Sequence, residues 1–184
     1  MKIPEHAKKV FKGVLYDVYH WDQELYDGTT KIFEMLKRNP ASFVIPISDD
    51  GNIYILEQEQ PGRQPYYSFP GGSGEDGEDA LELAKRELLE ETGLVGYDWE
   101  LFKTYNQSGK IDYEKPCYIS RNCKKIQEQE LDGGEKIKVI KVNWEEFKTI
   151  ITGPKFRMSD FGFDFVRELY NGREEELKKK ILGK

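Results

Sequence analysis

Cysteine and histidine are scarce in this chain of 184 residues, which holds two of each. Cys117 and Cys123 are six positions apart and do not form a Cys-x-x-Cys pair, so we do not expect a zinc site. Disulfides are rare in reducing compartments, where thiols stay free. We therefore expect both cysteines to be free and the protein to be cytoplasmic.

The sequence also lacks a long hydrophobic run and an excess of positive charge. No stretch approaches the ~18 apolar residues of a membrane span, and the start, MKIPEHAKKV, does not resemble a signal peptide. The net charge is −6, whereas binding to nucleic acids or anionic membranes relies on clustered Lys and Arg. We expect neither as a partner. A small anionic ligand is still allowed, because a bound metal ion can invert the local charge.

Apolar and aromatic residues, at 38% and 13%, are sufficient for one core domain with a small extra subdomain. Alternating β-branched and aromatic residues, separated by turn signals such as Asp27-Gly28 and Asp50-Gly51, indicate strands. Residues 30–37 are expected as a strand, with a helix as the alternative. Loops are expected at 109–116 and 127–135. The pattern predicts an α+β fold. Strands are expected at 10–20, 30–37, 42–48, 52–57, 66–69, 98–105, 116–122 and 136–143, and helices at 78–92, 144–152, 160–170 and 172–182.

The helix at 78–92 carries an acidic face. Glu87, Glu90 and Glu91 have i, i+3 and i+4 spacing and share one side, where like charges destabilise a helix by a few tenths of a kcal/mol per pair. Either an open solvated surface or a bound cation offsets this repulsion. Gly71-Gly72 precedes the helix, and glycines let backbone carbonyls approach an ion closely. Carboxylates with carbonyl oxygens form the ligand set that Mg²⁺ prefers.

The ends of this helix have their own signals. Asp76 is a predicted N-cap, with Asp79 three residues on, and Gly93 is a predicted C-terminal stop. The glycine pair, the acidic face and the final glycine of the helix follow one fixed spacing. Gly72 is followed after five residues by Glu78, and after seven more by Arg86-Glu87-Leu88-Leu89-Glu90-Glu91-Thr92-Gly93-Leu94.

This spacing resembles the box of the Nudix hydrolase family, Gly-x5-Glu-x7-Arg-Glu-U-x-Glu-Glu-x-Gly-U with U aliphatic, at every specified position. The resemblance implies an α/β/α sandwich in which Mg²⁺, or Mn²⁺, bridges a pyrophosphate that water attacks in line. It also implies that Arg86 and Glu78 brace the loop and helix. The implied metal ligands are the Gly71 carbonyl, Glu87, Glu90 and Glu91, and the implied catalytic residues are Arg86, Glu87, Glu90 and Glu135.

Glu135 belongs to a second acidic segment, GGEKIKVIKV, which is similar to a family loop whose glutamate reaches the metal site. The resemblance implies that Glu135 is a metal ligand or the base that activates water. Asp132, Glu130 and Glu128 on the same loop are alternatives, and a solvent-exposed role for Glu135 is a further one.

Outside the box, residues 11–48 resemble the start of ADP-ribose pyrophosphatases. That subfamily implies an N-terminal antiparallel β-sheet subdomain at 1–40, used in a domain-swapped homodimer, and a Nudix hydrolase domain at 41–184. The implied reaction converts ADP-ribose or another nucleoside-diphosphate sugar to a nucleoside monophosphate and a sugar phosphate. The alternatives are another nucleotide substrate (a nucleoside triphosphate, a dinucleotide polyphosphate or a coenzyme A derivative) or a non-catalytic nucleotide-sensing Nudix module.

The substrate-binding residues are less well marked. Gln60 stands where the subfamily has an arginine and Ser68 where it has a glutamate, and Arg63 is a replacement for the lost guanidinium. Tyr67 could stack on a base, although alternation puts it on one face with Phe69, which is expected in the core. Lys110 and Arg157 could contact phosphate. We predict Gln60, Arg63, Tyr67 and Lys110 as substrate-binding residues, with packing or solvent exposure as the alternative for each.

Overall fold

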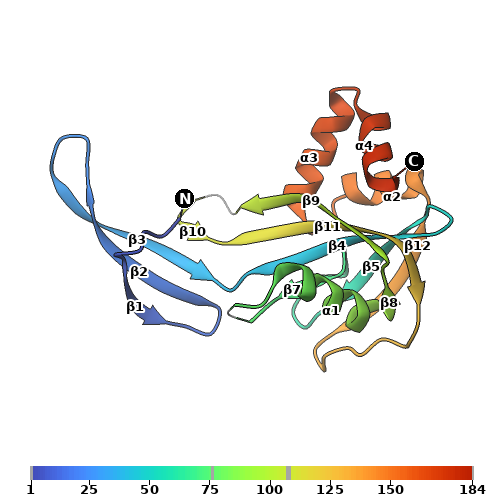
Figure 1. Cartoon of the computed structure of the whole chain (residues 1–184), viewed down its shortest axis with the longest axis horizontal. Helices are drawn as coiled ribbons and strands as arrows, with labels where there is room; N and C mark the ends of the chain where they lie inside the picture. Colours follow the sequence, from blue (N-terminus) through green and yellow to red (C-terminus); the bar gives the residue numbers. More distant parts are fainter. Residues whose placement is uncertain (1, 76, 107–108, 184) are drawn as a thin grey trace.

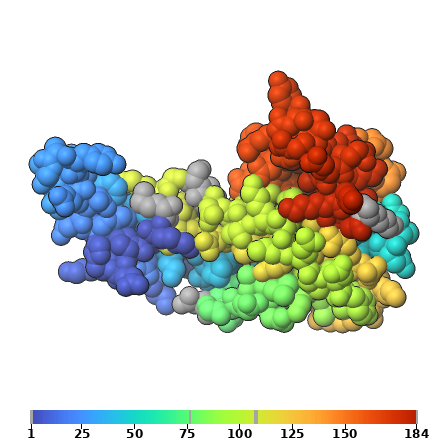
Figure 2. Space-filling view, turned by 45° about the horizontal axis from the view of Figure 1, so that its top comes forward, coloured from blue at the N-terminus to red at the C-terminus, as the bar shows by residue number. Residues whose placement is uncertain are grey.

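The computed structural model describes residues 2–75, 77–106 and 109–183, which form two β-sheets and four helices (Figure 1). The smaller sheet has the order β1-β2-β3-β10, with β10 parallel to β3 and the other pairs antiparallel. In the space-filling view it projects from the rest of the molecule as an arm (Figure 2, blue). Its strands are β1 (Lys8–Lys12), β2 (Tyr16–Glu24), β3 (Thr30–Arg38) and β10 (Ile111–Asp112).

The single strand predicted at 10–20 is wrong, because a turn at Gly13 divides it into β1 and β2. The Gly13 N–H donates to the Tyr16 carbonyl at 3.0 Å, and a Cβ at Gly13 would lie 2.4 Å from that oxygen. The predicted turn at Asp27-Gly28 is confirmed, since the Asp27 carboxylate accepts the N–H of Thr29 at 3.0 Å. The strand predicted at 30–37 is confirmed as β3.

The larger sheet has the order β12-β5-β4-β11-β8, with β6 added to β5, β7 to β4 and β9 to β11. Strands β4 and β11 are parallel neighbours at its centre, and every residue of β4 is buried. The predicted β4–β5 hairpin is confirmed. The bounds are β4 (Ala41–Ser48), β5 (Ile53–Glu59), β6 (Tyr66–Ser68), β7 (Gly71–Ser73), β8 (Leu94–Val95), β9 (Asp98–Asn106), β11 (Glu114–Lys125) and β12 (Lys136–Val142).

Three short strands, β7, β8 and β10, were not predicted, and β10 lies within the loop expected at 109–116. Each has two or three residues, which is too short for an alternating pattern to be recognised. Their pairing comes from distant strands: β7 pairs with β4, β8 with β11 and β10 with β3. The other predicted strands agree with the structure to within a few residues at each end.

Helices cover both faces of the larger sheet, with α1 on one face and the other three on the opposite face (Figure 1). Val44 of β4 packs with Leu88 of α1, whereas its neighbours Phe43 and Ile45 belong to the core that includes Phe147 of α2. The fold is therefore the expected α+β, α/β/α sandwich. The helices are α1 (Ala80–Thr92), α2 (Trp144–Thr152), α3 (Ser159–Tyr170) and α4 (Glu174–Leu182).

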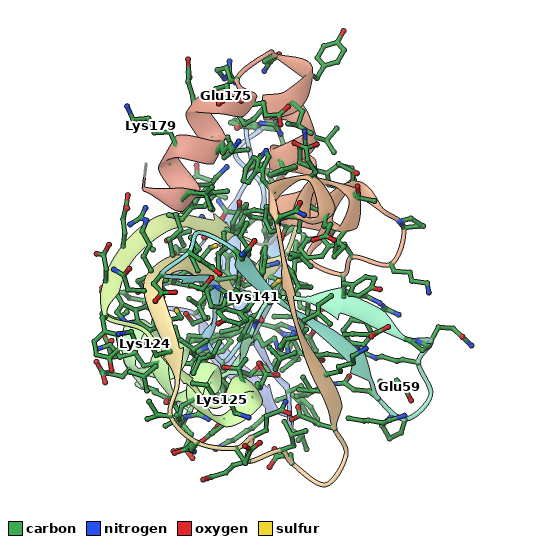
Figure 3. All side chains as sticks on the ribbon, turned by 90° about the vertical axis from the view of Figure 1, so that its right-hand side faces the viewer. Glu59, Lys124, Lys125, Lys141, Glu175 and Lys179 are labelled. Atoms are coloured by element: carbon green, nitrogen blue, oxygen red, sulfur yellow. The ribbon has the colours of Figure 1, made fainter. Side chains whose placement is uncertain are left out.

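The six charged side chains labelled in Figure 3 lie at the periphery of the molecule. Figure 3 shows Glu175 and Lys179 on α4, and Glu59, Lys124, Lys125 and Lys141 on strands, all exposed. Both cysteines are free, as predicted, and buried. Across the described ranges, none of the helices combines the length and the apolar character that crossing a membrane requires.

Candidate active site

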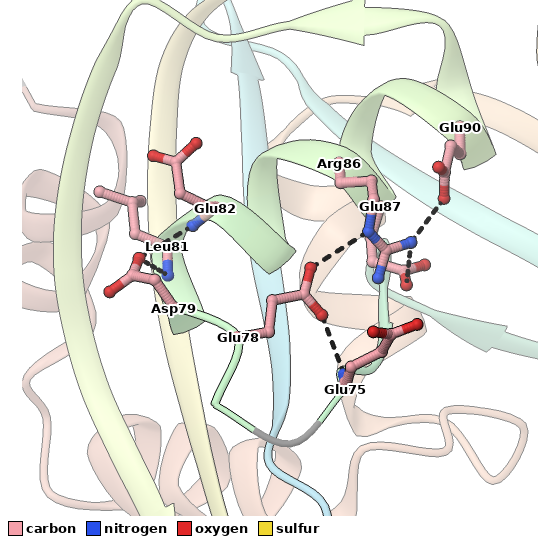
Figure 4. Close-up of polar contacts among 8 residues, drawn as sticks. All are labelled: Glu75, Glu78, Asp79, Leu81, Glu82, Arg86, Glu87 and Glu90. Carbon is pink, nitrogen blue, oxygen red and sulfur yellow. Dashed lines mark hydrogen bonds and ion pairs between the residues drawn. The ribbon is translucent and has the colours of Figure 1, made fainter.

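Helix α1 starts two residues later than predicted. The expected N-cap, Asp76, lies outside the described residues. The N-cap is Asp79, whose carboxylate accepts the N–H groups of Leu81 at 2.9 Å and Glu82 at 3.1 Å (Figure 4). A carboxylate at this end also faces the positive pole of the helix, so Asp79 fixes where the helix begins.

The end of α1 is Gly93, as predicted. Its φ of 71° is left-handed, and its N–H donates to the Leu89 carbonyl at 2.7 Å. A Cβ here would lie 2.1 Å from the carbonyl oxygen of Gln127, so the glycine also permits the acidic loop to approach the helix.

Arg86 joins the loop before α1 to the helix itself. Its guanidinium pairs with Glu78 at 3.2 Å, with Glu87 at 3.1 Å and with Glu90 at 2.8 Å (Figure 4). Glu78 also accepts the backbone N–H of Glu75 at 3.0 Å. This hydrogen bond is the main reason that the pKa of Glu78 lies below its usual range, and the hydrogen bond from Arg86 is the second. This arrangement fits the bracing role that the resemblance implies for Arg86 and Glu78.

Glu91 is the most buried of the three box carboxylates on this face, with 4% of the residue exposed. Its Oε2 accepts the N–H of Gly71 at 2.7 Å. Burial raises the pKa of Glu91 to about 9, against the opposing effect of the Gly71 N–H, and repulsion from Glu87, Glu135 and Glu90 adds to the increase. A carboxylate that is costly to ionise alone is well suited to a cation partner.

Glu87 packs directly on the glycine pair. A Cβ at Gly72 would lie 2.5 Å from Glu87 Oε1, and one at Gly71 would lie 2.3 Å from the Ser42 carbonyl oxygen. The two glycines are therefore needed for close packing of β7 between β4 and the acidic face of α1. Burial raises the pKa of Glu87, Arg86 opposes the shift, and Glu90 and Glu135 add to it.

The second acidic segment is tied to the end of α1. The N–H of Glu130 donates to the Glu90 carbonyl at 2.8 Å, and the Gln129 amide donates to the Glu91 carbonyl at 2.6 Å. These bonds hold the loop at 127–135 against the acidic face. Burial raises the pKa of Glu135 on this loop, with repulsion from Asp132 as the next cause.

Helix and loop together enclose a pocket of about 390 Å³. Of the alternatives for the general base, Glu135, Asp132 and Glu130 line it, whereas Glu128 pairs with Lys125 at 2.8 Å and is not in the lining. Among the described residues, six carboxylates and one guanidinium contribute to its walls. The lining residues are Gly71, Gly72, Ser73, Arg86, Glu87, Glu90, Glu91, Glu130, Asp132 and Glu135.

The donor set fits a hard divalent cation, because the described residues of the pocket offer carboxylate oxygens beside the backbone of β7, and no thiolate or imidazole is among them. Within residues 2–75, 77–106 and 109–183, no group of three His, Cys, Asp or Glu side chains is already arranged to hold a metal ion. Arg86 instead draws Glu87 and Glu90 toward its guanidinium. A bound Mg²⁺ or Mn²⁺ would therefore compete with this guanidinium for the two carboxylates.

The predicted substrate-binding residues lie outside the acidic pocket. Gln60 and Arg63 are in the loop between β5 and β6, where the Arg63 N–H donates to the Gln60 carbonyl at 3.1 Å. Tyr67 on β6 packs against the core cluster that contains Phe69, as the alternation predicted. Lys110 lies 4.6 Å from the ring centre of Phe33 in the N-terminal sheet, so a single chain does not bring it to the acidic pocket.

Sequence reasoning missed a buried polar residue beside Glu91. Gln58 of β5 has its Nε2 at 3.5 Å from Glu91 Oε1, and its Oε1 accepts the Tyr66 hydroxyl at 2.8 Å. A glutamine that follows the buried apolar residues of β5 was the available signal, because a polar group inside a sheet needs a partner. Arg157 lies with its guanidinium 5.0 Å from the ring centre of Tyr66, the first residue of β6.

Comparison with known proteins agrees with this geometry. Residues 37–169 match the family described as "NUDIX domain". The chain is 29% identical over 142 residues to an ADP-ribose pyrophosphatase of Bacillus subtilis (strain 168), covering 76% of this chain and 77% of that protein. It is 30% identical over 143 residues to a methanol dehydrogenase activator of Bacillus methanolicus, covering 76% and 77%.

Other similarities extend to the fold and to a second named hydrolase. The ADP compounds hydrolase NudE of Escherichia coli (strain K12) is 25% identical over 147 residues, covering 76% of this chain and 75% of that protein. A crystal structure of an ADP compounds hydrolase superposes with a TM-score of 0.70 at 22% identity, covering 92% of this chain and 94% of that one. With Gly72, Arg86, Glu87, Glu90 and Glu91 of the box gathered in one acidic pocket, the family match shows that this chain belongs to the Nudix family and is a pyrophosphohydrolase.

Proposed function

We propose that this protein uses Mg²⁺, with Mn²⁺ as a substitute, to cleave ADP-ribose or a related nucleoside-diphosphate sugar to a nucleoside monophosphate and a sugar phosphate. The observation that carries the proposal is the acidic pocket beside α1, whose carboxylates outnumber its one guanidinium six to one among the described residues. A dianionic diphosphate can approach such a surface only with a cation between them. Similarity to proteins named for ADP-ribose and ADP compounds supports the substrate class.

Six residues of the pocket have proposed roles. Glu87, Glu90, Glu91 and the Gly71 carbonyl would hold the cation, and Glu135 would complete its ligands or take the proton of the attacking water. When bound, the cation supplies charge neutralisation for the diphosphate and lowers the pKa of water. Arg86 keeps the carboxylates of α1 in place through its contacts with Glu87 and Glu90.

Substrate recognition is proposed for the loop between β5 and β6, with Gln60, Arg63 and Tyr67. Arg157 adds a second guanidinium near the end of this loop, since it lies 5.0 Å from the ring centre of Tyr66, the first residue of β6. Guanidinium groups pair with phosphate through two hydrogen bonds, which would hold the part of the substrate beyond the metal. A substrate contact for Lys110 stays a prediction. Its position beside Phe33 does not support that contact within one chain.

A substrate panel tests the proposal. The purified protein is incubated with Mg²⁺ and ADP-ribose, nucleoside-diphosphate sugars, nucleoside triphosphates, dinucleotide polyphosphates and coenzyme A, and products are separated by anion-exchange chromatography. Release of AMP and ribose 5-phosphate from ADP-ribose, without inorganic pyrophosphate, is the expected result. Preferred cleavage of a triphosphate, a dinucleotide polyphosphate or coenzyme A would replace the substrate assignment. Tight nucleotide binding without any product would favour a sensing module.

We also propose a homodimer formed through the N-terminal sheet, with 1–40 as the dimerisation subdomain and 41–184 as the hydrolase domain. The support is a set of exposed apolar side chains on this sheet and its turn, which a partner surface would cover. They include Phe11 and Leu15 at 61% exposure each, Val14 at 100% and Ile32 at 70%. Light scattering that gives twice the mass of one chain is the expected result. A cytoplasmic location is proposed from the two free thiols.

A further inference from the structure

Both oxygens of the Glu91 carboxylate face a donor, although the side chain is almost completely buried. The Gly71 N–H lies 2.7 Å from Oε2, and the Gln58 amide nitrogen lies 3.5 Å from Oε1. The last torsion of a glutamate side chain has a broad range when the carboxylate is free. One donor on each oxygen restricts this rotation and sets the plane of the carboxylate.

The Gln58 amide is itself held at both ends. Its oxygen accepts the Tyr66 hydroxyl at 2.8 Å, and its nitrogen donates to the Ser68 hydroxyl oxygen at 2.8 Å. The three residues are each between 5% and 7% exposed. With Glu91 ionised, as a metal ligand is, an amide flip would place the Gln58 oxygen against the carboxylate, where two acceptors would face each other. Such a flip is costly in a buried network, so the amide presents its nitrogen to Glu91.

We propose that Gln58, fixed by Tyr66 and Ser68, is a positioning residue that aims the Glu91 carboxylate at the cation. This proposal rests on the metal-dependent function proposed above. Gln58 and Glu91 are 33 residues apart in the chain and come from β5 and α1, so only the packing of sheet and helix brings them together. Replacing a residue that hydrogen-bonds a metal ligand commonly weakens metal affinity by roughly 10-fold to 100-fold.

Two variants test the proposal at different points of the network. Gln58→Leu keeps the approximate size of the side chain and removes both donors from its end, whereas Tyr66→Phe keeps the aromatic ring and removes the hydroxyl that holds the amide. Mn²⁺ affinity is measured by electron paramagnetic resonance of free Mn²⁺ without substrate. ADP-ribose hydrolysis is then followed against Mn²⁺ concentration. Tyr54→Phe is the matched control. Tyr54 lies on β5, as Gln58 does, but it packs with the cluster of Val44 and Leu88.

We expect Mn²⁺ affinity to fall about tenfold in Gln58→Leu, at the lower end of the range for such residues, because the 3.5 Å contact is long. The loss in Tyr66→Phe should be about threefold. In both variants saturating Mn²⁺ should restore most of kcat, and KM for ADP-ribose should stay within about twofold. A residue with a purely structural role would not produce this dependence on Mn²⁺.

Mn²⁺ affinities of both variants within twofold of the parent protein would overturn the proposal, as would a loss of kcat that Mn²⁺ does not restore. Tyr66→Phe decides the question if Gln58→Leu fails to fold. A parent protein that binds Mn²⁺ but cleaves no substrate of the panel would refute the proposed reaction, while the Mn²⁺ titrations would still decide the role of Gln58. A parent protein that does not bind Mn²⁺ would overturn both.

Discussion

Replacing Glu91 with glutamine removes one negative charge from the acidic pocket and changes the shape of the side chain very little. The amide oxygen of the new residue can still accept the Gly71 N–H, which lies 2.7 Å from Oε2 in the parent protein. The substitution therefore separates the charge of Glu91 from its packing. Its effects on turnover and on stability should have opposite signs.

Turnover should fall because a neutral amide is a weaker ligand for a divalent cation than a carboxylate. A metal ion acting as a Lewis acid contributes several kcal/mol to transition-state stabilisation. Loss of roughly 4 kcal/mol of it corresponds to a decrease in kcat of about 10³-fold, at 1.36 kcal/mol for each factor of ten.

Stability in the absence of metal should rise. Burial raises the pKa of Glu91 to about 9 from an unperturbed value of 4.5, so folding at pH 7 forces this carboxyl to take up a proton. That uptake costs about 1.4 kcal/mol for each pH unit between 4.5 and 7, or about 3.5 kcal/mol as an upper bound. A neutral glutamine avoids this cost. For a chain of this length, at roughly 2–4 °C per kcal/mol, the gain corresponds to an increase in Tm of at most about 14 °C.

Three measurements examine these effects together: thermal unfolding in EDTA at pH 7, thermal unfolding with added Mg²⁺, and ADP-ribose hydrolysis. Mg²⁺ should raise the Tm of the parent protein much more than that of the variant, because ligand binding stabilises the folded state in proportion to its affinity. Glu82→Gln is the matched control on the same helix, since Glu82 has a side chain that is 66% exposed and pairs with Lys85. The control should leave all three measurements nearly unchanged.

The reasoning is refuted if Glu91→Gln retains the turnover of the parent protein with Mg²⁺. A lower Tm in EDTA would contradict the electrostatic part, because it would mean that the ionised carboxylate stabilises the metal-free fold. Both outcomes are distinguishable from general misfolding by the circular dichroism spectrum of the variant, which should match that of the parent.

Three further predictions concern the same region. In EDTA the folded state holds a proton on Glu91 up to about pH 9, whereas the unfolded chain releases it near 4.5, so stability in urea should decrease as pH rises from 5 to 9; a flat or rising profile would contradict the shift. Gly93→Ala places a Cβ 2.1 Å from the Gln127 carbonyl oxygen at a φ of 71°, and should lower the free energy of unfolding by about 2 kcal/mol; unchanged denaturation midpoints would argue against this packing. Glu135→Gln should lower kcat about 100-fold and Asp132→Asn less than about fivefold, as steady-state assays would show; the reverse order would make Asp132 the base.

Sequence patterns predicted the regions of local structure well. Residues 78–92 contain strong helix formers and end at a glycine, and α1 follows at Ala80–Thr92. The β4–β5 hairpin follows from Asp50-Gly51 between two apolar runs. Two predictions failed for different reasons. A local turn at Gly13 divides one expected strand into two. Strand β10 forms through a distant contact, because Lys110 and Ile111 pair with β3.

The spacing within α1 alone determined that Glu87, Glu90 and Glu91 share a face, because the helical repeat is local. Only the tertiary structure decided which loop acids join that face. It placed Glu135 in the pocket and left Glu128 on Lys125, since the loop is fastened through backbone bonds to the end of α1.

The tertiary structure also placed Gln58 against Glu91 and kept Lys110 beside Phe33 in a single chain. Neither follows from periodicity, because each depends on segments far apart in sequence that meet through sheet pairing and core packing. The repeat of helix α1 therefore set the positions of three of the six pocket carboxylates, Glu87, Glu90 and Glu91. The residues around these carboxylates depended on the pairing and packing of strands that are far apart in the sequence.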